Sequence, residues 1–119
     1  MTVEGSVTIE NTLDVQAMAN VCVVTGDVIV AANGMTSISL PVLASVAGGV
    51  FINNNAALTS ISLPALASVG GDVFIEFNAA LTSISLPVLA SAGSVVIQSN
   101  SALTTCTGLL IVNEGDCVQ

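Results

Sequence analysis

The sequence predicts an all-β fold, a single-stranded β-solenoid of about five short coils of 21–23 residues each. The first observation is an internal repeat: Leu-Thr-Ser-Ile-Ser-Leu-Pro occupies residues 58–64 and 81–87, and Met-Thr-Ser-Ile-Ser-Leu-Pro occupies 35–41. The second is that apolar and polar residues alternate within each copy with the period of a strand. The third is the β-branched content, which together with a proline and a glycine pair in most units disfavours helix.

Each coil is expected to turn three apolar sets towards one core. In the first set Ile38 and Leu40 alternate with serines, and in the next Leu43 and Val46 precede a glycine corner. The third set follows that glycine. Its copies align at residues 5–9, 26–30, 49–52, 71–75, 93–97 and, after a shortened step, 108–111. The whole chain is therefore read as repeat.

One domain covers residues 1–119 in this interpretation. It has an amino-terminal edge coil at 1–25, regular repeats at 26–105 and a carboxyl-terminal closing coil at 106–119, which carries cysteines. No capping helix is apparent at the amino end. Two interpretations of that end stay open: Glu4 and Glu10 keep the first strand from pairing with neighbours, or subunits stack end to end.

A column of asparagines follows the glycine-led strand. Because stacked side-chain amides satisfy one another and nearby carbonyls, we expect a structural ladder with no catalytic or ligand-binding role. Its members are Asn33, Asn55, Asn78 and Asn100.

The outward positions of the glycine-led strands are also apolar. A strand that is apolar on both faces is normally buried on both, and the chain has no spare segment to cover the outer side. The sequence therefore predicts that another chain covers it. The predicted assembly interface consists of Ile29, Phe51, Phe74, Val96 and Leu110.

Three cysteines are present, an odd number. Cys106 takes the place of a core isoleucine, and Cys117 lies on a tail that could fold back over it, so a Cys106–Cys117 disulfide is the preferred pairing. Cys22 aligns with an alanine column expected to face outward or lie at a corner, where its thiol could link chains. The alternative is three small buried residues in a reducing compartment.

Composition excludes several classes of partner. The chain has no Lys, Arg or His and a formal charge of −8, so we expect no nucleic-acid binding and no electrostatic docking on membranes. Residues 28–71 carry no charge, but turn residues interrupt them, so no transmembrane segment is predicted. Residues 1–4 do not resemble a secretory signal peptide, which predicts a mature form with an added Met or another export route.

The composition also argues against catalysis. Without His, Lys or Tyr there is no ordinary base to activate the many hydroxyls, so we expect no enzyme, no cofactor and no small-molecule substrate. Asp27 and Asp72 occupy equivalent sites two coils apart, about 10 Å, and are interpreted as solvated turn carboxylates. Glu114 and Asp116 lack the rest of a calcium loop, and three scattered cysteines do not form a metal site.

The unit Leu-Thr-Ser-Ile-Ser-Leu-Pro-Xaa-Leu-Ala-Ser-Val-Gly-Gly-Asp-Val-Phe-Ile-Glu-Phe-Asn resembles the leucine-rich β-helical repeats of receptor L-domains and of similar cell-surface proteins in fungi and bacteria. The resemblance covers nearly the whole chain. It implies a right-handed solenoid at a cell surface and carries over no catalytic residue.

Three functions are compatible with these features. The preferred one is a self-assembling extracellular or cell-surface structural protein that forms a fibre, sheath or cell-wall layer by lateral and axial association. The alternative is a surface module that binds a glycan or protein, although Tyr, Trp and Arg anchors are lacking. A minor alternative is ice binding through the serine columns, with Thr36, Thr59 and Thr82 expected inward or at a corner.

Overall fold

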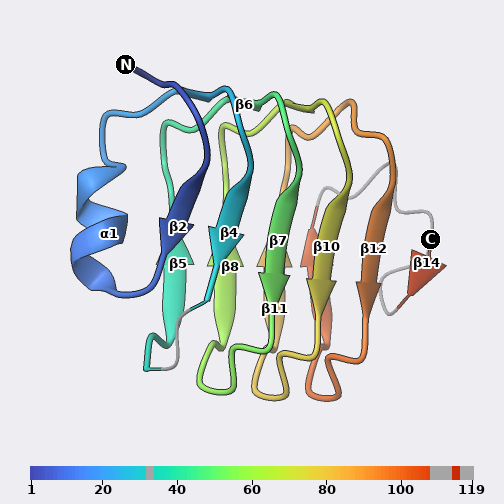
Figure 1. Ribbon diagram of the computed structural model, residues 1–119. Helices are drawn as coiled ribbons and strands as arrows, with labels where there is room; N and C mark the ends of the chain where they lie inside the picture. The colour runs from blue at the N-terminus through green and yellow to red at the C-terminus, as the bar shows by residue number, and fades with distance from the viewer. Residues whose placement is uncertain (32–33, 108–113, 116–119) are drawn as a thin grey trace.

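The computed structural model describes residues 1–31, 34–107 and 114–115, with the backbone alone for 105–107 and 114–115. The predicted β-solenoid is confirmed: parallel strands stack coil on coil into three sheets (Figure 1). Equivalent valines pair from coil to coil, Val7 with Val28, Val28 with Val50, Val50 with Val73 and Val73 with Val95, at steps of 21 to 23 residues. Between Val7 and Val95 the chain therefore makes about four turns of about 22 residues.

The coils with β5–β7 and β8–β10 contribute one strand to each sheet, and the next coil meets sheet A only through a bridge between Ser91 and Ser68. Sheet A contains β1 (Thr2–Val3), β3 (Val23–Val24), β6 (Ser45–Val46) and β9 (Ser68–Val69). Sheet B contains β2 (Val7–Ile9), β4 (Val28–Val30), β7 (Val50–Asn53), β10 (Val73–Glu76), β12 (Val95–Gln98) and β14 (Glu114–Gly115). Sheet C contains β5 (Ser37–Ser39), β8 (Ser60–Ser62), β11 (Ser83–Ser85) and β13 (Thr105–Thr107).

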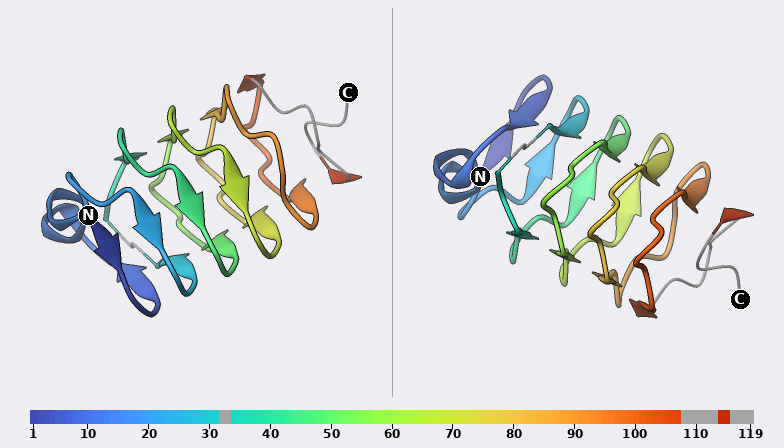
Figure 2. Two further views of the ribbon diagram at one scale, coloured as in Figure 1. Left: turned by 90° about the horizontal axis from the view of Figure 1, so that it is seen from above. Right: turned by 90° about the horizontal axis from the view of Figure 1, so that it is seen from below.

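The three sheets form a flattened prism with principal extents of 34 × 30 × 18 Å. Sheets B and C form its two broad sides, and sheet A closes the narrow side between them (Figures 1 and 2). The core is aliphatic and follows the predicted pattern: Val50 and Ile52 of sheet B, Ile38 of sheet C and Val46 of sheet A are each 1% exposed. Leucines between the strands, such as Leu66 at 0%, fill the corners.

The amino-terminal coil departs from the prediction, because a short helix, α1 (Thr12–Ala17), takes the place of a sheet C strand. Two hydrogen bonds fix its start: the side chain of the N-cap Asn11 accepts from the Asp14 N–H at 3.0 Å, and the Asp14 carboxylate accepts from the N–H of Glu10, the residue before the cap, at 2.8 Å. Met18, 3% exposed, follows the helix into the core. The expectation that no helix caps this end was wrong.

Candidate functional site

The outer face of sheet B carries an apolar row at the predicted positions. Strand register aligns Thr8, Ile29, Phe51, Phe74 and Val96 across five coils. The row is less exposed than the sequence suggested, because Ile29, Phe51 and Phe74 are half-buried and Val96 is only 9% exposed. Leu110 lies outside the described residues. The backbone position next to Val96 is occupied by Glu114, so the apolar row ends there.

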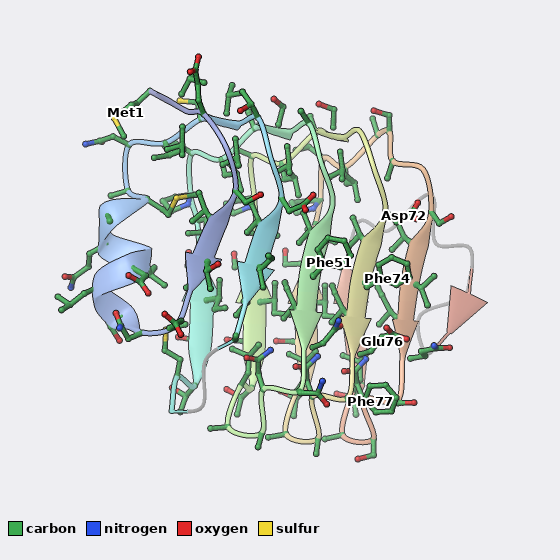
Figure 3. All side chains as sticks on the ribbon, viewed as in Figure 1. Met1, Phe51, Asp72, Phe74, Glu76 and Phe77 are labelled. Atoms are coloured by element: carbon green, nitrogen blue, oxygen red, sulfur yellow. The ribbon has the colours of Figure 1, made fainter. Side chains whose placement is uncertain are left out.

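Stacking explains the partial burial of the two phenylalanines (Figure 3). The Phe51 and Phe74 rings lie 5.7 Å apart between centroids with an interplanar angle of 11°. The Phe51 ring also lies over Gly49, where an added Cβ would come within 2.9 Å of two ring carbons. The two rings therefore turn one face towards each other.

A polar row runs beside the apolar one. Asn53, Glu76 and Gln98 pair across three coils, two residues after the apolar row on each strand. The Glu76 N–H donates to Asn53 Oδ1 at 3.2 Å, and Gln98 Nε2 donates to the Glu76 carboxylate. The Glu76 carboxylate is thus held by the Gln98 amide, and it places a negative charge next to the row of stacked rings.

Phe77 lies at the end of this face, directly after β10, and the sequence prediction missed it (Figure 3). Its side chain is 57% exposed, and its backbone has φ of 58°, the left-handed region. Asn54 and Ser99, at the equivalent corner of neighbouring coils, have φ of 60° and 58°. All three phenylalanines of the chain therefore lie on or beside the outer face of sheet B, and none lies in the core.

The asparagine column forms a hydrogen-bonded ladder inside the turn. Asn55, Asn78 and Asn100 are 0%, 0% and 3% exposed. Asn55 Nδ2 donates to Asn78 Oδ1 at 3.0 Å, and Asn78 Nδ2 donates to Asn100 Oδ1 at 3.0 Å. The same oxygens accept backbone N–H groups, and Asn78 Nδ2 also reaches the Ile52 carbonyl at 2.9 Å. The structure brings these three together as a structural element, and Asn33 lies outside the described residues.

The turn carboxylates also have structural contacts. Asp27 Oδ1 accepts the Gly49 N–H of the next coil at 2.8 Å, and the Asp27 N–H donates to Ser6 Oγ of the previous coil at 3.0 Å. Asp27 and Asp72 are half-buried rather than fully solvated. Asp27 therefore links three coils at one corner.

Among the three cysteines the structure describes the side chain of Cys22 and the backbone of Cys106. Cys22 is half-buried with a free thiol, and its Sγ lies 3.7 Å from the amino-terminal nitrogen. Backbone bonds from Ala44 N–H to the Cys22 carbonyl and from Ala67 N–H to the Ala44 carbonyl place it in the alanine column. Cys106 pairs in register with Ile84. Cys117 lies outside the described residues, so the disulfide stays a prediction.

The opposite broad side carries hydroxyls in register. The outward rows of sheet C are Ser37, Ser60, Ser83 and then Ser39, Ser62, Ser85. The threonine column (Thr36, Thr59 and Thr82) lies at a corner and is exposed. This is one of the two placements expected from the sequence, and the inward placement is not found. Its hydroxyls are engaged: Thr59 Oγ1 donates to the Thr36 carbonyl at 2.8 Å, and Thr82 Oγ1 to the Thr59 carbonyl at 3.1 Å.

Across residues 1–31, 34–107 and 114–115 there is no pocket and no group of three metal-ligating side chains. No helix in this part of the chain has the length and apolar character needed to cross a membrane. Comparison of the chain with protein-family models, curated proteins and solved structures gives no significant match. The resemblance to receptor L-domains therefore stays an interpretation of the repeat.

Proposed function

We propose that the chain is a self-assembling structural protein, located outside the cell or at its surface, whose copies pack side by side through the outer face of sheet B. The observation that carries this proposal is the position of the aromatic residues. All three phenylalanines lie on or beside one broad outer face, although the core could have held them. Aromatic side chains at a surface are typical of the centre of protein interfaces.

The spacing of the strands supports the same conclusion. A second copy presents the same strand spacing of about 4.8 Å, so its rows can fit between those of the first. Pairing through this one face closes at two copies, so the proposed fibre, sheath or cell-wall layer forms when such pairs also associate axially through their coil ends.

Two features favour this proposal over a glycan-binding module. A sugar stacks on an open aromatic face, but Phe51 and Phe74 turn one face of each ring towards the other. The described residues also form no pocket. Axial association contributes less at the amino end, because α1 takes the place of the sheet C strand there (Figure 1).

The test combines size-exclusion chromatography with light scattering and negative-stain microscopy, with and without reductant. The wild-type chain should form elongated oligomers that dissociate on dilution. The double variant Phe51→Thr/Phe74→Thr, which copies Thr8 of the same row, should stay monomeric and folded. The control variant Val88→Thr removes an apolar side chain that is 49% exposed elsewhere and should assemble like the wild type. A wild-type monomer at every concentration would reject the proposal in favour of the binding module.

Ice binding remains a second candidate because of sheet C. Its serine hydroxyls form two in-register rows on a flat side without charge. The measurement is thermal hysteresis of the wild-type chain against Ser60→Val/Ser83→Val. Hysteresis that the variant abolishes would favour this function.

A further inference from the structure

Phe77 combines two unfavourable properties at one position. An aromatic side chain that is 57% exposed gains little from burial in the folded monomer. A bulky residue with φ of 58° is also a conformational outlier, because its Cβ crowds the backbone in the left-handed region. Folding of a single copy therefore gains little from Phe at this corner, and Asn would adopt the same backbone conformation at lower cost.

The neighbouring coils show that the corner does not require Phe. Asn54 and Ser99 adopt the same φ within about 2°, and Asn is the side chain that tolerates this conformation best after Gly. The backbone bonds of the corner involve main-chain atoms alone: the Asn54 N–H donates to the Glu76 carbonyl at 3.1 Å, and the Phe77 N–H to the Gln98 carbonyl at 3.4 Å. A strained residue retained against its folding cost is typical of a functional contact.

We propose that Phe77 is the anchor by which a second copy of this chain docks on the outer face of sheet B. This inference rests on the proposed function and names the residue that fixes how the copies meet. The occupant is a second copy because its face carries the same Phe51–Phe74 stack, against which an exposed ring can pack, and because an identical sheet has the same strand spacing.

The geometry of such a pair is simple. Phe77 lies three residues beyond Phe74, about 10 Å along the strand direction. When two copies face each other about a two-fold axis near Glu76, the Phe77 ring of each reaches the Phe51–Phe74 stack of the other. The stack offers ring edges to an incoming ring face, which is the favoured aromatic geometry. The two Glu76 carboxylates approach each other near the axis, so the contact should strengthen as salt screens them.

The test is the variant Phe77→Asn, which copies Asn54. We expect a monomer that unfolds at the same or a higher urea concentration, together with a dissociation constant for assembly raised at least about tenfold. Leu13→Asn is the matched control: it removes a side chain that is 73% exposed on α1 and should leave assembly unchanged. Phe77→Ser, which copies Ser99, repeats the measurement with a second side chain compatible with the corner.

The outcomes separate the inference from the proposed function. If the wild type assembles and Phe77→Asn assembles equally well, the anchor is wrong while lateral assembly stands. If the wild type is monomeric, both fail. Destabilisation of both Phe77→Asn and Phe77→Ser would overturn the argument from strain, since Phe would then contribute to folding. Binding of a soluble neutral glycan that depends on Phe77, with no self-association, would also overturn the proposal.

Discussion

Replacement of Asn78 by Ala should be among the most destabilising single changes in the chain. Its side-chain amide makes four hydrogen bonds. Nδ2 donates to the Ile52 carbonyl and to Asn100 Oδ1, and Oδ1 accepts from both the backbone N–H and the Nδ2 of Asn55. Asn78 is 0% exposed, so water cannot replace these contacts. The side chain therefore connects the coil before it to the coil after it.

The magnitude follows from the groups left behind. In Asn78→Ala the Asn55 backbone N–H loses an acceptor at 3.0 Å, and the Ile52 carbonyl loses a donor at 2.9 Å. A buried group without its partner costs about 1–3 kcal/mol, so the two together cost about 2–6 kcal/mol. The total stability of a domain of this size is about 5–15 kcal/mol. The variant should be marginally folded.

Urea unfolding followed by far-ultraviolet circular dichroism is the assay, because the chain has no Trp or Tyr for fluorescence. Gln16→Ala is the control: it removes an exposed amide from α1 and should change stability by less than about 0.5 kcal/mol. A loss below about 1 kcal/mol in Asn78→Ala would refute the reasoning, since the ladder would then be exchangeable with water or other partners.

Three further outcomes are expected. Gly48→Ala should cost about 1–3 kcal/mol in urea unfolding, because its Cβ would clash with Asp27 Oδ1 and lie 2.7 Å from the Gly26 carbonyl oxygen. Gly34→Ala, with no atom within 4 Å of its Cβ, should be near neutral, and equal costs would contradict the corner packing. Glu76→Gln should assemble at a lower protein concentration, measured by light scattering, because it removes a repulsion between like charges of about 1 kcal/mol at 4 Å in water. Weaker assembly of this variant would count against the proposed face. Wild-type assembly should increase from about 0.01 M to about 1 M salt, as the screening length falls from about 30 Å to about 3 Å; salt-induced dissociation would point to attractive charge pairing instead.

Much of the fold follows from the repeat. Because each coil copies the one before, residues at equivalent positions must pair in parallel, and Val50 does pair with Val73. Burial is predictable for the same reason, since alternate residues of a strand face opposite sides. The asparagine ladder is the polar counterpart: a buried amide at a repeated position has its copy within hydrogen-bond reach.

The remainder depends on features that a repeat does not encode. Helix α1 is six residues long, too short for a visible apolar stripe, and only the Asn11–Asp14 cap could have indicated it. The shielding of Phe51 depends on a stacking neighbour and on the space above Gly49. The left-handed corner at Phe77 comes from the path of the backbone, and only the Asn54 of the previous coil hints at it.

The ladder has one further consequence, for how such a chain can change in length. Each amide contacts only the coils next to it, so a duplicated unit of 23 residues would find every partner it needs in the copies above and below. Insertion of one unit should lengthen the prism by about 4.8 Å and add one strand to both broad sides. Gene-level duplication or loss of a unit can therefore tune the contact area between copies without redesigning the turn.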